Sequence, residues 1–360
     1  MTPVLVIAEA GVNHNGDRDM AFQLIDAAAE SGADAVKFQT FKAENLVTKG
    51  AAKASYQQQT TSSNETQFAM LKRLELSHAM HHELMEYCEK KKIIFLSTAF
   101  DSESLTFLVN DLGLKTLKIS SGDITNGPLI LEYAQTECDL IVSTGMSTLP
   151  EIKQALEVIA FGLIHGKKSS VKPSREAFKS AYASSGIRQL LYEKVTLLHC
   201  TSEYPAPAKD INLSAITTMR KTFGLKTGYS DHSEGVAVSV AAVALGAMLI
   251  EKHFTLDKNL PGPDHKASLE PDELKTMVDA IRVVEQAIGD GQKVPMPSEL
   301  GNRNMVRKSL VASSDIKVGD PFTEDKISIK RPGIGRSPMD YWDMLGNRSH
   351  REYCADDVIE

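Results

Sequence analysis

The chain has 360 residues, a formal net charge of −7 at pH 7 and a hydrophobic content of 42%. That much apolar sequence can fill large cores, which excludes an intrinsically disordered chain, and the length suits a barrel of ordinary size followed by a modest second domain. The acidic balance argues against general binding to nucleic acid. No apolar run approaches the ~20 residues that span a bilayer, so we expect neither nucleic-acid nor membrane partners.

The N-terminus enters a strand pattern at once, which leaves no room for a secretory signal. The four cysteines (Cys88, Cys138, Cys200 and Cys354) are scattered without CxxC or metal-ligand spacing. We therefore expect a reduced, cytoplasmic protein.

Strand and helix patterns alternate from the start of the chain. Residues 5–11 (LVIAEAG) predict a strand, residues 17–34 a helix with Gly32 as its C-terminal cap, and residues 35–40 (AVKFQT) a second strand. Further strands are predicted in IIFLSTAF, LKISSGD, LIVSTG, VTLLHC, KTGYSDH and MLIEKH. The fifth strand leads into a helix that can begin with a capping box of Thr148 and Glu151.

Eight such units favour an α/β fold in which the strands close into a (β/α)8 TIM barrel. The alternative is an open doubly wound sheet. That fold normally carries a glycine-rich phosphate loop after its first strand, and no GxGxxG stands there.

Two segments interrupt the alternation. Residues 161–194 carry seven Lys/Arg and two Glu, and are either a basic lid over an anionic substrate or a solvated helical insertion. Residues 289–302 are rich in Gly, Pro and polar residues and are predicted to link a catalytic barrel (1–288) to a small β-rich domain (303–360). A domain of that size has a marginal core, so we expect it to rest on its own barrel or on a partner chain.

Three histidines stand where predicted strands end. His232 and His253 end the seventh and eighth strands, so their imidazoles can converge on one divalent ion (Mn, Zn or Fe) and leave its other positions to water and substrate. His199 ends the sixth strand, but LLHC fits a packed interior histidine equally well. Asp264, beyond the eighth strand, can orient a metal-bound water or a substrate hydroxyl, or can simply form a turn.

Cationic and hydroxyl side chains stand at four successive strand ends: Lys37, Thr98, Lys118, Ser121 and Ser143. Such donors predict a site for a phosphate or carboxylate, because hydrogen bonds to ionised oxygens are strong. A lysine inside a strand is costly unless it meets an anion or pairs with a carboxylate such as Glu9 or Asp123. Those two carboxylates are candidates for proton transfer or for binding hydroxyls.

These residues predict a metal-assisted enzyme with a phosphorylated, anionic substrate. Aldol-type condensation, phosphotransfer and isomerisation all remain open at this point.

Nine ordered motifs resemble those of the sialic acid (nonulosonic acid) synthase family: IAEAGVNHNG, AVKFQT, FLSTAF, KISSGD, VSTGMS, HCTSEYPAP, GYSDH, EKHFT and PGPDHKASLEP. The tail, with KSLVAS, IKVGD and IKRPGIG, resembles that family's antifreeze-like (SAF) domain, so the resemblance covers the whole chain. It implies condensation of phosphoenolpyruvate with an N-acylated mannose-type sugar in its open aldehyde form, with release of phosphate by C–O cleavage.

The resemblance also implies roles for individual residues. His232 and His253 would hold Mn2+, and the five strand-end donors would bind phosphoenolpyruvate. Four residues would lie near the sugar and metal: Glu9, Gln39, Tyr204 and Asp264. Arg331 resembles an arginine that reaches the N-acyl group of sugar bound in a partner subunit, which implies a domain-swapped homodimer.

Two positions depart from the family pattern. Asp123 stands where some relatives carry Glu, which shortens the arm of a residue expected to activate water. Ser202 replaces an Asn typical of N-acetylneuraminate synthesis, and the xEYPAP form resembles legionaminic acid synthases. Because Ser202 can leave room beside Tyr204 for a bulkier substituent, we expect 2,4-diacetamido-2,4,6-trideoxymannose as acceptor in preference to N-acetylmannosamine. A metal-dependent aldolase using pyruvate and a non-catalytic carbohydrate-binding protein are the alternatives.

Overall fold

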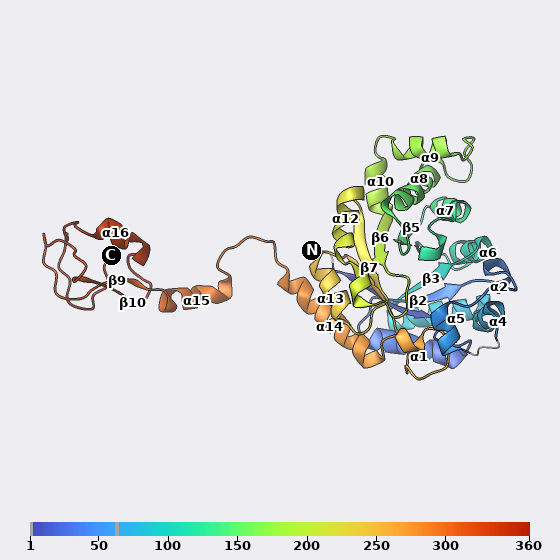
Figure 1. The fold of residues 1–360 in the computed structure, drawn as a ribbon, viewed down its shortest axis with the longest axis horizontal. Coiled ribbons are helices and arrows are strands. Elements are labelled where there is room, and N and C mark those ends of the chain that lie inside the picture. Colours follow the sequence, from blue (N-terminus) through green and yellow to red (C-terminus); the bar gives the residue numbers. More distant parts are fainter. Residues whose placement is uncertain (1–2, 62–64) are drawn as a thin grey trace. The chain divides into compact units, whose positions relative to one another are not determined.

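The computed structural model describes residues 3–61 and 65–360 (Figure 1). Its first unit is a closed barrel of parallel strands paired in chain order, with β1 also pairing with β8. The barrel strands are β1 (Leu5–Gly11), β2 (Ala35–Thr40), β3 (Ile94–Ala99), β4 (Thr116–Ile119), β5 (Asp139–Ser143), β6 (Val195–Cys200), β7 (Lys226–Asp231) and β8 (Leu249–His253). The predicted (β/α)8 barrel is therefore confirmed.

Helices surround this barrel on its outside (Figure 1). The α-helices of the first unit are α1 (Arg18–Glu30), α2 (Ala43–Leu46), α3 (Ser55–Thr60), α4 (Gln67–Leu74), α5 (His78–Lys91), α6 (Ser102–Thr106), α7 (Gly127–Ala134), α8 (Leu149–His165), α9 (Arg175–Tyr182), α10 (Ile187–Lys194), α11 (Ala208–Ile211), α12 (Ser214–Phe223), α13 (Ala237–Ala244) and α14 (Pro271–Ala287). Short turns of other helical types are η1 (Phe107–Asp111), η2 (Ser121–Asp123) and η3 (His265–Ala267). At the start of α8, the Glu151 carboxylate accepts a hydrogen bond from the backbone N–H of Thr148, as in a capping box, and also accepts one from the Thr148 hydroxyl.

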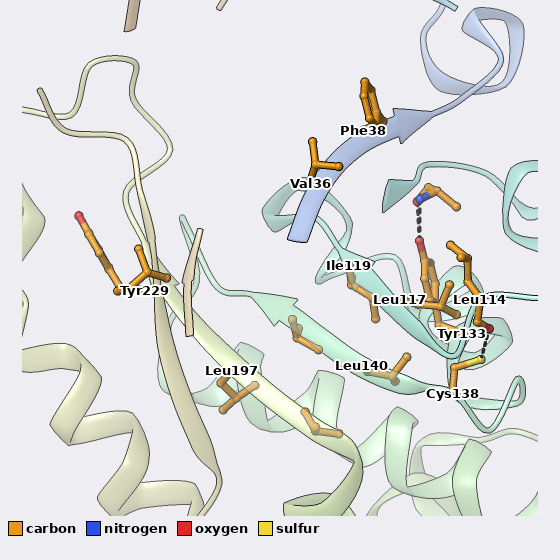
Figure 2. Packing of buried hydrophobic residues seen from close by; sticks show 14 of the residues in the cluster. Val36, Phe38, Leu114, Leu117, Ile119, Tyr133, Cys138, Leu140, Leu197 and Tyr229 are labelled. Atoms are coloured by element: carbon orange, nitrogen blue, oxygen red, sulfur yellow. Dashed lines mark hydrogen bonds between the residues drawn. The ribbon is translucent and has the colours of Figure 1, made fainter. Parts of the chain in front are cut away.

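The outer faces of the strands bury apolar side chains against the helices. Val36, Phe38 and Leu117 belong to this core, and Figure 2 shows strand residues of this kind beside Tyr133 of α7. The Tyr133 hydroxyl donates to the carbonyl of Ala99 over 2.6 Å, so the helix is tied to the strand end as well as packed against it. Burial on both faces explains why these strands read as continuous apolar runs.

The side chains that face the inside of the barrel change from apolar to polar along the strands. Near the amino ends, one layer of apolar side chains fills the barrel: Ile7, Ala35, Leu96, Ile141, Leu198 and Leu249. Side chains two positions apart point the same way in a strand. Two positions after five of these residues, the inward side chains are Glu9, Lys37, Thr98, Ser143 and Glu251. The barrel is thus sealed below and polar at its carboxyl ends.

The basic segment 161–194 forms the end of α8 followed by α9 and α10. Phe178 of α9 meets Phe161 of α8 edge to face, with ring centroids 5.2 Å apart. The segment is therefore a helical insertion packed on the outside of the barrel.

The second compact unit comprises Asp290–Glu360. It contains α15 (Pro297–Val306), the antiparallel pair β9 (Ser309–Ala312) and β10 (Ile327–Lys330), η4 (Pro338–Asp340) and α16 (Tyr341–Met344). Helix α15 begins inside the segment 289–302 that is predicted to link the two domains. Pro297 begins the helix, and the carboxylate of Glu299 accepts from the backbone of Met296 over 2.9 Å.

Within the described residues, no helix is long and apolar enough to cross a membrane.

Candidate active site

A cavity of about 480 Å³ lies at the carboxyl ends of the barrel strands. Its lining includes twelve of the residues singled out from the sequence: Glu9, Lys37, Gln39, Thr98, Lys118, Ser121, Ser143, Ser202, Tyr204, His232, His253 and Asp264. Asp123 is not among the lining residues, and Arg331 is an exposed residue of the second unit. The ends of many different strands and the loops that follow them therefore supply one shared pocket, as the barrel fold allows.

Two buried lysines and two buried carboxylates meet on the floor of the cavity. The Lys37 ammonium is 2.6 Å from Glu9 Oε2 and 3.6 Å from Glu251 Oε2. The Lys118 ammonium is 3.4 Å from Glu251 Oε1, which also accepts a hydrogen bond from Ser230. Since all four groups are buried, the two positive charges are held in place by the two carboxylates.

The two carboxylates titrate in opposite directions. Burial raises the pKa of Glu9 and repulsion from Glu251 adds to this, while Lys37 offsets only part. Burial also opposes ionisation of Glu251, but Lys118 and Lys37 outweigh it and lower its pKa. Burial likewise opposes the charge on Lys37, yet Glu251 and Glu9 raise its pKa above the ordinary value. Of the two carboxylates, Glu9 therefore takes up a proton more readily, while the two lysines keep Glu251 ionised.

Hydroxyl and amide donors border the lysines. The Lys37 ammonium donates to Thr98 Oγ1 over 3.0 Å. Ser121 Oγ accepts from the backbone N–H of Gly145 over 3.0 Å and lies 3.1 Å from Cys200 Sγ, a weak partner that an anion can replace. Ser143 Oγ is buried, with no hydrogen-bond partner among the described residues. These groups are placed to donate to an anion bound over the lysines.

A close approach fixes the residue type at Gly145. A Cβ atom there would lie 2.3 Å from Ser202 Oγ, 2.8 Å from Ser121 Oγ and 3.1 Å from Cys200 Sγ. Only glycine lets the ends of β4, β5 and β6 converge in this way. Ser202 consequently lies beside the hydroxyl donors at the ends of β4 and β5.

The imidazoles of His232 and His253 face one another across neighbouring strand ends, with ring centroids 5.8 Å apart. His232 Nδ1 lies 2.6 Å from the carbonyl of Thr201, so Nδ1 carries the hydrogen and Nε2 the lone pair. The Tyr204 hydroxyl is 3.1 Å from that Nε2. Burial lowers the pKa of His232 to about 4, and burial together with the neighbouring His232 lowers the pKa of His253 well below its ordinary value.

This pair fits a divalent metal ion. Burial favours the neutral form of both rings, and the Nδ1–H of His232 donates to a backbone carbonyl, as the second nitrogen of metal-ligating histidines commonly does. His253 Nδ1 is buried, without a hydrogen-bond partner in the described part of the chain. No cluster of three or more His, Cys, Asp or Glu side chains with ligand geometry exists within the described residues. An ion on these two imidazoles would therefore take its other ligands from water or substrate, the arrangement of a Lewis acid.

Asp264 projects into the cavity from a loop that is anchored to the end of β8. Ser268 Oγ donates to the Asp264 carbonyl over 2.7 Å, and Asn13 donates to Ser268 Oγ over 2.9 Å and to the Phe254 carbonyl over 2.8 Å. Burial raises the pKa of the Asp264 carboxyl from 3.8 to about 6. The loop thus presents a carboxyl group that takes up a proton in weakly acidic solution.

Two further candidates do not line the cavity. The half-buried His199 ring has its Nε2 2.6 Å from the Ile211 carbonyl. This nitrogen therefore has a backbone hydrogen-bond partner. The Asp123 carboxylate accepts from Ser120 over 2.5 Å, and Ser120 is itself a lining residue. Asp123 therefore reaches the cavity through its neighbour.

Glu251 is a functional residue of the floor that was not predicted from the sequence. It stands in MLIEKH, one residue before a polar pair that ends a strand, and a carboxylate inside a strand is as costly to bury as a lysine. The same reasoning that selected Lys37 and Lys118 would have selected it. Lys252 follows Glu251 and faces outward, where its ammonium is 3.0 Å from the buried Asp231 carboxylate.

Fold and cavity together define a barrel enzyme whose site combines a floor of cations, hydroxyl donors and two neutral imidazoles. Residues 24–293 match the model of the NeuB family. The chain is 48% identical to an N,N'-diacetyllegionaminic acid synthase of Campylobacter jejuni, over 100% of this chain and 99% of that protein. It is 44% identical to an N,N'-diacetyllegionaminic acid synthase of Legionella pneumophila, over 95% and 89% of the two chains.

Solved structures give the same result. The crystal structure of N-acetylneuraminic acid synthetase from Leptospira borgpetersenii, in complex with citrate, matches with a TM-score of 0.66 and 33% identity, over 84% of this chain and 90% of that chain. The chain therefore belongs to the NeuB family, and the resemblance found in the sequence is confirmed.

Proposed function

We propose that this protein is a nonulosonic acid synthase, which condenses phosphoenolpyruvate with an N-acylated mannose-type sugar and releases phosphate. The observation that carries the proposal is the buried pair of Lys37 and Lys118 beside two neutral imidazoles in one cavity. The first pair suits the phosphate and carboxylate of phosphoenolpyruvate. The second suits a divalent ion beside the acceptor aldehyde.

Phosphoenolpyruvate would lie over the lysines, with Thr98, Ser121 and Ser143 donating to its anionic oxygens. Those donors are neighbours in the structure, and Ser143 Oγ is buried with no other described partner. On binding, the phosphate would compete with Glu9 and Glu251 for the two ammonium groups. Protonation of Glu9, whose pKa is already raised, would relieve the excess negative charge.

The acceptor sugar would lie between the imidazoles and the mouth of the cavity. His232 and His253 would hold the ion, which we propose to be Mn2+, and the ion would polarise the aldehyde oxygen. Four lining residues would contact the sugar: Gln39, Ser202, Tyr204 and Asp264. The Tyr204 hydroxyl, 3.1 Å from His232 Nε2, would give up that lone pair to the ion and hydrogen-bond the sugar instead.

The reaction joins two carbon atoms and consumes one water molecule. Carbon 3 of phosphoenolpyruvate attacks the aldehyde carbon while the aldehyde oxygen gains a proton. Water adds to carbon 2, and phosphate leaves as the bond between carbon 2 and its bridging oxygen breaks. Glu9, Asp264 and Asp123 are the carboxyl groups in or beside the cavity that we propose for proton transfer.

We further propose a domain-swapped homodimer in which Arg331 of the antifreeze-like (SAF) unit reaches the N-acyl group of sugar bound by the partner. The second unit exposes Ile334, Met339 and Trp342, each more than 60% accessible. Apolar side chains exposed in this number support a contact surface. The four free cysteines, three of them buried, support our placement of the protein in the cytoplasm.

The test is phosphate release by the full-length protein with Mn2+, using phosphoenolpyruvate and each of two sugars, 2,4-diacetamido-2,4,6-trideoxymannose and N-acetylmannosamine. We expect release only when both substrates are present, and a higher kcat/KM with the diacetamido sugar. Release without sugar, or product formed from free pyruvate as an aldolase would give, would refute the proposal. A preference for N-acetylmannosamine would overturn only the choice of acceptor.

A further inference from the structure

One wall of the catalytic cavity is apolar. A small hydrophobic cluster, separate from the barrel cores, contains Val12, Phe41, Met70 and Leu74, with Leu46, Leu71 and Phe100 packed against it. Five of these side chains also line the cavity: Val12, Met70, Leu71, Leu74 and Phe100. We call these five residues the apolar wall.

The connection between β2 and β3 builds this wall by placing α4 over the strand ends. Met70 and Leu74, one helical turn apart, are fully buried on one face of α4, and Leu71 beside them is half-buried. Thr66 caps the helix by accepting from the backbone of Ala69. At its other end, the Glu75 carboxylate accepts from the backbone of Ala43 in α2 over 2.7 Å. The helix is therefore fixed at both ends.

The position of the wall determines which part of a ligand can touch it. Val12 comes directly after β1 and Phe100 directly after β3, so both lie beyond the floor residues Glu9 and Thr98 of the same strands. The reacting carbon of the acceptor must approach the floor and the imidazoles. A sugar bound in this way extends its opposite end beyond the floor, to the level at which the wall lies.

An apolar wall disfavours hydroxyl groups. A hydroxyl placed there loses its hydrogen bonds to water and finds no replacement on Val12, Leu71 or Phe100. A methyl carbon at the same place gains contact area instead. The remaining lining is mostly charged and polar, apart from Ala54, Met146 and Pro263, and Gln67 lines the cavity from the first turn of α4. The wall is therefore the one stretch where five apolar side chains of a single cluster meet the pocket among the described residues.

We infer that the apolar wall receives the terminal carbon of the acceptor and selects a methyl group over a hydroxymethyl group at carbon 6. The inference rests on the proposed function and adds a specificity determinant to it. Hydrophobic pockets discriminate between groups that differ by one small substituent by about 10- to 100-fold, and that is the expected preference in kcat/KM.

The experiment compares two sugars that differ only at carbon 6, N-acetylmannosamine and its 6-deoxy analogue, with saturating phosphoenolpyruvate and Mn2+. The wild-type protein should favour the 6-deoxy sugar by about 10-fold or more in kcat/KM. Leu71→Asn, which places an amide in the wall, should bring the ratio close to one. Leu71→Met, which keeps the wall apolar, should retain the preference.

Leu46→Asn is the matched control. Leu46 packs against the same cluster but is not among the described residues that line the cavity. This variant should lose stability to a similar degree and keep the wild-type ratio of the two sugars. The readout is thus a ratio within one protein sample, which partial unfolding does not change.

The outcomes separate the two levels of the argument. Turnover of both sugars without a 6-deoxy preference in the wild-type protein would overturn the role of the wall and leave the synthase intact. An unchanged ratio in Leu71→Asn, or an equal change in Leu46→Asn, would also overturn it. Absence of phosphate release with every sugar, the diacetamido sugar included, would refute the proposed function itself.

Discussion

Replacing Asp264 with Asn should stabilise the fold and impair the enzyme. Burial raises the pKa of this carboxyl from 3.8 to about 6, so the folded protein binds the proton more tightly than the unfolded chain does. Stability from this group is therefore greatest below its unfolded pKa, falls as the pH rises between about 4 and 6, and stays low above that range. Asparagine carries no charge and removes this dependence.

The size of the effect follows from that pKa difference. A tenfold change in proton affinity corresponds to about 1.4 kcal/mol, so burying the ionised carboxylate of Asp264 costs about 3 kcal/mol at pH 8. At pH 4.5 the folded state keeps the proton while most unfolded chains lose it, and the cost of Asp264 relative to a neutral side chain is only about 1 kcal/mol. Asp264→Asn should thus gain about 3 kcal/mol of unfolding free energy at pH 8 and about a third of that at pH 4.5.

Denaturant unfolding followed by far-UV circular dichroism measures this gain in the barrel. Trp342, the only tryptophan, lies in the second unit, so its fluorescence reports separately on that unit. Asp279→Asn, at an exposed ion pair with Lys275 on α14, is the control and should change stability by less than about 1 kcal/mol at either pH. A destabilised Asp264→Asn protein at pH 8, or a gain of equal size at both pH values, would refute the reasoning. So would full activity in this variant.

Three other predictions concern the metal, the dimer and the loop support. His253→Ala should abolish Mn2+ binding in calorimetry and lower kcat/KM, with a loss of several kcal/mol of transition-state stabilisation. His199→Ala should keep its affinity for Mn2+. If His199→Ala loses Mn2+ binding and His253→Ala keeps it, the ligands are misassigned. Co-expressed Lys118→Ala and Arg331→Ala chains should recover activity in mixed dimers, each with one intact site; isolated mixed dimers that stay inactive would place the arginine in its own subunit's site or outside both. Asn13→Ala removes the donor to two buried acceptors, the Phe254 carbonyl and Ser268 Oγ, and should cost about 1–3 kcal/mol of stability. It should also lower kcat, with little change in KM for phosphoenolpyruvate. A variant with normal kcat would show that the loop carrying Asp264 does not need Asn13.

The barrel and the floor of its cavity were predictable because burial restricts which residues can follow one another in the sequence. A strand buried on both faces needs a continuous apolar run, and a lysine inside such a run is too costly to occur without a function or a partner. Lys37 and Lys118 therefore stood out. Glu251 also lies inside an apolar run, but the histidine two residues later, His253, has the more specific ligand chemistry and masks this signal.

Other features leave no such signal in the sequence. The apolar wall joins Val12 to α4, which lies more than fifty residues further along the chain, and only the closed barrel brings them together. Segment 289–302 is dense in Gly and Pro, which suggested a linker, yet Pro297 begins a helix, because proline is well tolerated at a first helical position. The sequence also left open whether His199 is a ligand or a packed residue, and the structure gives its ring a backbone partner, the carbonyl of Ile211.

The most direct test of the account is the fate of the bridging oxygen of phosphoenolpyruvate. With that oxygen labelled as 18O, and with the diacetamido sugar and Mn2+ present, mass spectrometry of the released phosphate shows which bond breaks. The account predicts that the label appears in phosphate, because carbon 2 loses its bridging oxygen and gains one from water. Unlabelled phosphate, with the label retained in the organic product, would contradict it.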